Sequence, residues 1–286
     1  MGYLIALIPA ICWGIIPLFT TRVGGSSSNQ VFGIGLGALI VSIISMLLMR
    51  PSIDLVPFVV AVISGACWSV GQFGQFASMK KIGVSNTMPL STAFQLIGNT
   101  LVGVCIFHEW TGTRQVVIGF IALALVVIGA MLTSITDKSA GKSVAIKDIL
   151  FLLVTTLGYI VYSAFPRFPV LAHTDSIAIY LPETIGILLG VTIYQLMTEG
   201  PKVFKQRGQY ANVLSGLLWG VAGLSYIFCA RAIGITVAFI FSQMNVLIST
   251  LGGIYFLKET KSSFEMRYTM IGLCFVVVGA VLTVFA

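Results

Sequence analysis

The chain has 286 residues, of which 57% are hydrophobic and only 9% are charged. Soluble domains carry about 25% charged residues, so this composition excludes a soluble globular protein and indicates an integral membrane protein built from helices. The formal net charge of +7 comes from basic residues scattered between apolar segments, which favours a role in membrane orientation over nucleic-acid binding.

Apolar segments long enough to cross a bilayer, which takes about 20 residues, recur along the whole chain. In chain order, the candidate spans are 3–21, 30–49, 55–79, 84–107, 115–135, 148–166, 176–197, 210–230, 235–257 and 267–285. The sequence therefore predicts an all-α membrane protein with ten transmembrane helices. The first span is expected to be an uncleaved helix, because no basic region precedes it as in a signal peptide.

The two halves of the chain resemble each other. VVIGAMLT at 126–133 matches VVVGAVLT at 276–283, and SGACWSV at 64–70 matches SGLLWGV at 215–221. Because the tryptophan and glycine positions recur in the same order, we interpret the halves as repeats rather than as chance similarity between apolar helices.

Each half holds five predicted spans, and an odd number inverts the second copy in the membrane. We therefore expect two inverted five-helix repeats, at 1–135 and 148–286, joined by a cytoplasmic linker at 136–147. Inverted repeats are the architecture of many secondary transporters, which bind their substrates near the membrane midplane.

Basic residues are shared unevenly between the two predicted sides of the membrane. Twelve lie in the breaks on the side of the linker, and four lie on the other side, namely Arg50, Arg114, Arg167 and Arg231. Since cytoplasmic loops carry an excess of Lys and Arg, we expect both termini to be extracellular.

Glu183, in the segment LPETIG at 181–186, is the only one of the nine acidic residues that lies well inside an apolar segment. A charged side chain at that depth costs roughly 2.5–3.5 kcal/mol on insertion scales. A proton or substrate site would explain such a residue, and a structural hydrogen bond to a neighbouring helix is the alternative. Aligning the GxxxG pairs at 186–190 and 33–37 places Glu183 opposite Gln30, so only one half has a titratable group there.

Polar and aromatic residues recur at helical spacing within several spans of both halves. Amides that face lipid are costly, so these side chains are expected to face the bundle interior or a wet cavity. The candidates for the wall of a substrate cavity are Trp13, Gln72, Gln95, Asn99, Tyr159, Tyr162, Trp219 and Gln243. The alternative is that these groups only hold neighbouring helices together.

The candidate wall is uncharged. Amides donate and accept hydrogen bonds, and aromatic faces pack on the apolar faces of sugar rings. No Lys or Arg lies deep in a predicted span to bind a phosphate or carboxylate, so the pattern favours an uncharged polyhydroxy solute. The five cysteines include no CxxC pair, and the two histidines are far apart in sequence. We therefore expect no metal site and no cofactor.

Four segments together resemble the bacterial glucose/ribose porter family of the drug/metabolite transporter superfamily. These are IPAICWGIIP at 8–17, STAFQLIGNTLVGVCIFHEW at 91–110, GYIVYSAFP at 158–166 and LPETIG at 181–186. The resemblance covers essentially the whole chain. It implies ten helices in two inverted repeats, a place in the bacterial cell membrane, and sugar uptake by proton symport.

We therefore expect a secondary transporter that imports glucose or ribose by alternating access, with the sugar, a proton and the lipid bilayer as its partners and no nucleic acid. Glu183 is the expected proton carrier, since carboxyl groups serve as proton relays in transporters. A metabolite or drug exporter of the same superfamily is the first alternative. A membrane enzyme acting on lipid-linked sugars is the second, but it would want paired acid and base groups, and only Glu109 lies beside a histidine.

Overall fold

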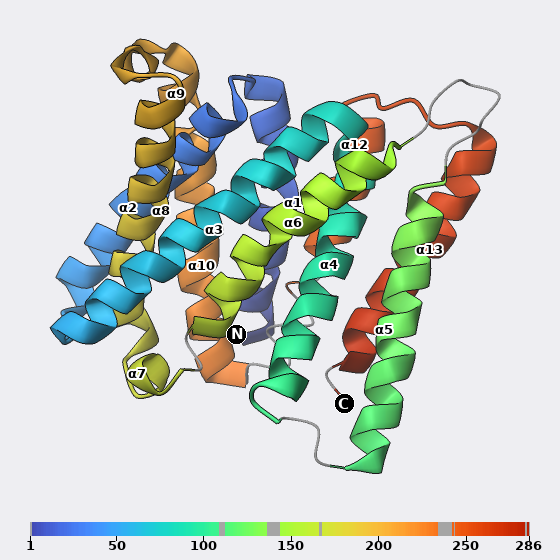
Figure 1. Cartoon of the computed structure of the whole chain (residues 1–286), viewed down its shortest axis with the longest axis horizontal. Coiled ribbons are helices and arrows are strands. Elements are labelled where there is room, and N and C mark those ends of the chain that lie inside the picture. The colour runs from blue at the N-terminus through green and yellow to red at the C-terminus, as the bar shows by residue number, and fades with distance from the viewer. Residues whose placement is uncertain are drawn as a thin grey trace.

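The computed structural model describes residues 2–108, 112–135, 144–165, 168–233, 242, 244–283 and 285. Regular structure within these ranges is entirely helical (Figure 1). The elements are α1 (Gly2–Val23), α2 (Ser27–Met49), α3 (Leu55–Ile82), α4 (Val84–Cys105), α5 (Thr113–Thr133), α6 (Ile146–Ala164), α7 (Pro169–Ala172), α8 (Ser176–Thr198), the 3-10 helix η3 (Pro201–Lys205), α9 (Arg207–Ala211), α10 (Val213–Ile233), α12 (Asn245–Tyr255) and α13 (Ser263–Thr283).

Eight helical stretches within the described residues are long and apolar enough to cross a membrane. They are α2, α3, α4, α5, α6, α8, α13 and the stretch Arg207–Cys229, and two shorter apolar helices are Leu7–Val23 and α12. The prediction of an all-α, multi-pass membrane protein is confirmed. The number of ten spans stays a prediction, and part of the expected span 235–257 lies outside the described residues.

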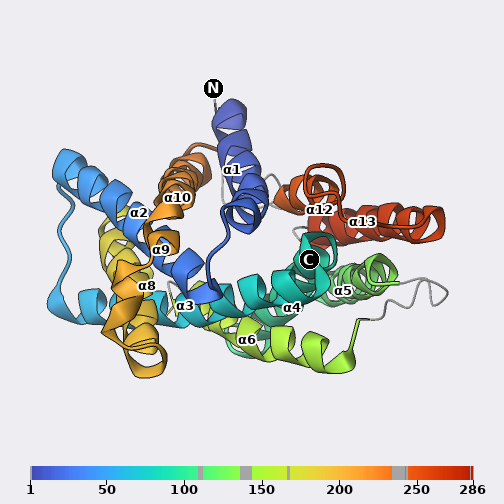
Figure 2. The same cartoon turned by 90° about the horizontal axis from the view of Figure 1, so that it is seen from above.

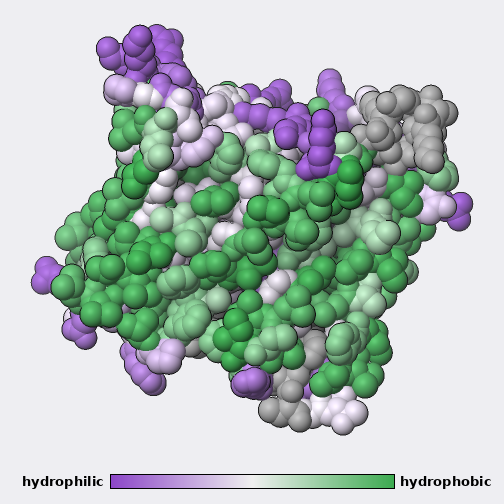
Figure 3. Space-filling model, in the orientation of Figure 1, coloured by the Kyte–Doolittle hydropathy of each residue, from purple (hydrophilic) through white to green (hydrophobic). Residues whose placement is uncertain are grey.

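The outer surface agrees with a membrane environment. Figure 3 shows a broad band of hydrophobic side chains across the molecule, with hydrophilic residues mainly above and below it. Large apolar side chains such as Leu48, Phe120 and Met131 are exposed on this surface. In a bilayer this surface would contact lipid, while backbone polar groups are satisfied within the helices.

Helix α3 extends to Ile82, beyond the end of the predicted span 55–79. Its last turn contains Lys80 and Lys81. These charges end the apolar segment but suit the helix, because cations interact favourably with the C-terminal end of the helix dipole.

Small residues set how closely the helices cross. Helix α3 packs on α6 and α8, α10 packs on α1 and α2, and α5 packs on α13 at one edge of the molecule (Figures 1 and 2). A Cβ atom on Gly65 of α3 would overlap the backbone carbonyl of Glu183 on α8. Glycine therefore allows backbone contact between these two helices, as in other membrane bundles.

Candidate functional site

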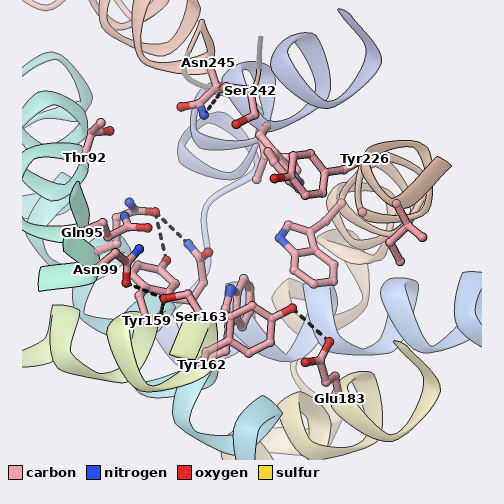
Figure 4. Close-up of a pocket in the computed structure, with 18 of the residues that line it drawn as sticks. Thr92, Gln95, Asn99, Tyr159, Tyr162, Ser163, Glu183, Tyr226, Ser242 and Asn245 are labelled. Carbon is pink, nitrogen blue, oxygen red and sulfur yellow. Dashed lines mark hydrogen bonds between the residues drawn. The ribbon is translucent and has the colours of Figure 1, made fainter. Parts of the chain in front are cut away.

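A cavity of about 460 Å³ lies among α1, α3, α4, α6, α8, α10 and the start of α12 (Figure 4). This volume lies within the range of roughly 300–1,000 Å³ that is typical of small-molecule sites. Helix ends border the cavity as well as helix middles, because Ser176 is the first residue of α8 and lines it.

The structure gathers most of the predicted site residues around this cavity. Glu183 lines it together with Trp13, Gln72, Gln95, Asn99, Tyr159, Tyr162 and Trp219. Gln243 lies outside the described residues, although Ser242 and Asn245 line the cavity. Their proximity is a structural fact, while their roles in binding stay predictions.

Gln30, the predicted counterpart of Glu183, does not line this cavity. It is buried near the start of α2, where its Nε2 donates to the carbonyl of Thr20 across 2.8 Å. The amide therefore ties α2 to the end of α1.

Aromatic rings form one wall. Trp68 and Trp219 meet edge to face with ring centroids 4.9 Å apart, and Tyr180 stacks on Trp219 with the rings inclined by 18°. Tyr159 and Tyr162 lie against Trp68, at 5.9 and 6.5 Å between centroids. Such edge-to-face contacts stabilise aromatic clusters, so this wall is held in place by its own packing.

Amide groups form an adjoining part of the lining and are joined by hydrogen bonds. Gln72 Nε2 donates to Gln75 Oε1 across 3.1 Å, and Tyr159 OH donates to the same oxygen across 3.2 Å. Gln75 Nε2 and Gln95 Nε2 both donate to Ser91 Oγ, at 2.8 and 3.1 Å. The network connects α3, α4 and α6 and fixes polar groups at the cavity surface, as satisfied buried networks do.

Further polar atoms complete the lining. Ser163 Oγ donates to Asn99 Oδ1 across 2.5 Å, which links α6 to α4. The indole Nε1 of Trp13 is buried and has no acceptor among the described residues. Buried donors are normally paired, so this N–H is available to a bound ligand or to water.

Glu183 lies two turns into α8 and is 7% exposed. The hydroxyl of Tyr162 donates to its Oε2 across 3.2 Å (Figure 4). Within the described part of the chain, the ion pair that forms is between Lys81 and Asp148, away from the cavity. The Glu183 carboxyl group therefore has a hydroxyl partner and no described counter-charge.

Several lining residues were not in the predicted set: Trp68, Gln75, Thr92, Ser163, Tyr180, Tyr226 and Asn245. Helical spacing could have found some of them. Tyr180 comes three residues before Glu183, and Ser163 comes four residues after Tyr159, so each pair shares a helix face.

At the N-terminal end of α4, away from the cavity, polar contacts join segments that are far apart in sequence. Glu259 accepts hydrogen bonds from the backbone N–H groups of Val84 and Ser85, at 2.6 and 2.9 Å. Lys261 Nζ donates to Asn86 Oδ1 across 2.9 Å. These N–H groups belong to the first turn of α4 and have no acceptor within the helix, and the positive end of the helix dipole also favours a carboxylate there. Glu259 therefore holds the segment before α13 against α4.

The chain is similar to known proteins over its whole length. A family model described as "Sugar transport protein" matches residues 4–286. A protein of Lactobacillus helveticus named "Putative sugar uptake protein" is 45% identical, over 98% of this chain and 99% of its own. A protein of Latilactobacillus sakei subsp. sakei named "Putative ribose uptake protein RbsU" is 39% identical, over 100% of this chain and 98% of its own.

One crystal structure aligns with 99% of this chain and 96% of its own, with a TM-score of 0.62 at 16% sequence identity. That likeness shows a shared fold and nothing further. The family match and the relatives confirm the resemblance found in the sequence and point to a transporter rather than an enzyme. The chain is a multi-pass cell-membrane protein that belongs to the sugar transport protein family of bacterial sugar uptake permeases.

Proposed function

We propose that this protein is a secondary transporter that imports a monosaccharide, glucose or ribose, together with a proton. The observation that carries the proposal is one cavity whose described lining combines an aromatic wall, an adjoining amide network and a single carboxyl group, Glu183. Its described lining contains no Lys, Arg or His, which suits an uncharged solute. The relative named for ribose uptake supports ribose as the first sugar to test.

Alternating access between two inverted repeats is the proposed mechanism, with repeats at 1–135 and 148–286 and a cytoplasmic linker at 136–147. Helix packing supports it, because the contacts that helices of the first half make with the second half recur when each helix is replaced by its proposed counterpart. Helix α3 packs on α6 and α8, and its proposed counterpart α10 packs on α1 and α2. Likewise, α4 packs on α6 as α12 packs on α1. Rocking of one half against the other would then expose the cavity to each side in turn.

Glycine contacts support a particular register for the repeats. Gly186 lies against the carbonyl of Val62, and Gly37 lies against the carbonyl of Val213. Positions 62 and 213 are separated by 151 residues, as are SGACWSV at 64–70 and SGLLWGV at 215–221. The packing therefore favours Gly37 as the counterpart of Gly186.

This register changes the position in the first repeat that corresponds to Glu183. With Gly37 opposite Gly186, Glu183 corresponds to Ile34 instead of Gln30. The contact of Gly65 with the Glu183 carbonyl and the contact of Gly216 with the Ile34 carbonyl agree with this pairing. On either register, the proposed proton carrier is present in one half only.

Uptake of radiolabelled glucose and ribose by proteoliposomes tests the function. With an inward proton gradient, we expect one of the two sugars to accumulate, and a proton uncoupler should abolish that accumulation. Equilibration without accumulation would indicate facilitative transport. Absence of uptake of both sugars would contradict the proposal, and efflux of other solutes from loaded vesicles would then support the exporter alternative.

Orientation is tested separately. The distribution of Lys and Arg supports extracellular termini, so tags at Met1 and Ala286 should be accessible to impermeant reagents in intact cells. Labelling of both tags only after permeabilisation would reverse the proposed topology.

A further inference from the structure

We propose that Tyr162 couples sugar binding to protonation of Glu183, by turning the direction of the hydrogen bond between them. This inference rests on the proposed proton-coupled uptake, and it assigns to Tyr162 a role beyond that of a cavity wall.

The geometry singles out one hydroxyl group. Tyr162 belongs to α6 and Glu183 to α8, and their side-chain oxygens lie 3.2 Å apart at the cavity surface (Figure 4). Among the described residues, Tyr162 is the only group that hydrogen-bonds the Glu183 carboxyl. Tyr180, the other tyrosine near this carboxyl group, donates instead to the backbone carbonyl of Gly220 across 2.7 Å.

A phenol has one proton to donate, and this limit creates the coupling. When Glu183 is ionised it can only accept hydrogen bonds, so the Tyr162 O–H donates to it and cannot donate to a ligand. When Glu183 has taken up a proton from cavity water, its own O–H can donate to the Tyr162 oxygen. The Tyr162 O–H then turns towards the cavity, where it can donate to an oxygen of the sugar. Protonation therefore adds one donor to the site.

The cavity has few other titratable groups. The described lining contributes the phenols of Tyr159, Tyr162, Tyr180 and Tyr226 and the single carboxyl of Glu183. Tyr159 already donates to Gln75 Oε1. The packed helix α3 contributes Gly65, Trp68 and amides here, and α2 contributes the Ser42 hydroxyl to Thr184. Glu183 is the one carboxyl group in this described set. A fall in pH would therefore protonate Glu183, while the phenols are already protonated.

The chain offers a matched control. Tyr162 and Tyr180 line the same cavity, and both contact its aromatic wall. Only Tyr162 hydrogen-bonds Glu183. Replacement of either by Phe removes one hydroxyl and keeps the ring, so the pair separates the coupling bond from general effects on the cavity.

The test is equilibrium binding of radiolabelled glucose and ribose to the purified full-length protein, across the range from about pH 6 to about pH 8, with the coupling expected to be on the order of 5-fold or more. The parent should bind its sugar more tightly at the acidic end. Tyr162→Phe should lose this pH dependence, whereas Tyr180→Phe should keep it whatever its effect on affinity. Glu183→Gln, whose amide can donate to Tyr162, should bind independently of pH with the affinity of the acidic parent.

The outcomes separate the two proposals. If the parent neither binds nor takes up either sugar, the proposed function fails. If the parent binds a sugar without pH dependence, or if Tyr162→Phe keeps the pH dependence of the parent, the coupling role of Tyr162 is wrong. Should Tyr162→Phe not fold, Glu183→Gln decides, because binding as weak as that of the alkaline parent would also overturn the proposal.

Discussion

Trp68 and Trp219 meet at the cavity with ring centroids 4.9 Å apart and ring planes inclined by 61°. They occupy the same position in the matching segments SGACWSV and SGLLWGV. Under the proposed two-repeat arrangement, side chains at equivalent positions can touch only close to the axis that relates the repeats. The proposed sugar site would therefore lie on that axis, where movement of either half reaches it.

The first prediction concerns this aromatic pair. Trp219→Ala should raise the KM for sugar uptake by about 3- to 10-fold, because an aromatic contact contributes about 0.5–1.5 kcal/mol beyond the area it buries. Trp219→Phe should restore most of the loss. Phe73→Leu is the matched control, since Phe73 packs on Tyr194 and does not line the cavity. An unchanged KM in Trp219→Ala would remove the aromatic wall from the binding site.

The second prediction concerns the proton carrier. Glu183→Gln should abolish accumulation of sugar against a gradient in proteoliposomes while counterflow exchange continues, because the amide cannot carry a proton. Glu199→Gln, at the end of the same helix, should accumulate sugar like the parent; Glu199 accepts from Ser28 and does not line the cavity. Accumulation by Glu183→Gln at the level of the parent would show that another group carries the proton.

The third prediction concerns the close contact of α3 and α8. Gly65→Ala should lower the free energy of unfolding of the detergent-solubilised protein by about 1–3 kcal/mol, because the added methyl group displaces the backbone of the neighbouring helix. The unfolding temperature should fall accordingly. The added methyl group would overlap the Glu183 carbonyl. Gly112→Ala is the control, because the nearest atom to its Cβ would be Gln115 Oε1 at 3.6 Å. Equal unfolding temperatures for the two variants would contradict backbone contact at Gly65.

The fourth prediction concerns the carboxylate that caps α4. Glu259→Ala should destabilise the protein by about 0.5–2 kcal/mol, since two backbone N–H groups lose their acceptor at a helix N-terminus. Asp54→Ala is the matched control, because Asp54 stands at the N-cap of α3 without a side-chain capping hydrogen bond. Thermal unfolding checks both variants, and an effect of Asp54→Ala as large as that of Glu259→Ala would speak against a specific cap.

The fifth prediction concerns pH. Burial lowers the pKa of the Lys261 amino group from its ordinary value of 10.5, and the nearby Glu265 and Glu259 carboxylates oppose this in part. The folded state therefore releases this proton more readily than the unfolded state. The penalty for burying the charge is complete below the folded pKa and disappears as the pH rises towards 10.5, so stability should increase over that interval.

Lys261→Met should flatten this rise in unfolding temperature with pH, whatever it does to stability at neutral pH. Lys202→Met, which changes an exposed lysine, should leave the slope as in the parent. A slope in Lys261→Met equal to that of the parent would show that this amino group is solvated in the folded protein.

The sequence alone determined the membrane class, the helical fold and the sugar uptake family. Each depends on local properties, namely composition, the length of apolar segments and motifs such as LPETIG at 181–186. Helical spacing likewise selected amides and aromatics such as Gln95 and Tyr159, because polar groups in a membrane segment must face the protein interior. The cavity lining contains both residues.

Only the tertiary structure decided which helix faces meet. The bond from Tyr162 to Glu183 joins α6 to α8, and the cap of Val84 by Glu259 joins α4 to the segment before α13, across 175 residues of sequence. A glycine contact allows α3 to cross α8 closely, at Gly65 and the Glu183 carbonyl, and under the proposed two-repeat arrangement such contacts favour Ile34 over Gln30 as the counterpart of Glu183. Spacing along one helix shows which residues share a face, but the rotation and depth of the neighbouring helix depend on backbone contacts between segments that are distant in sequence.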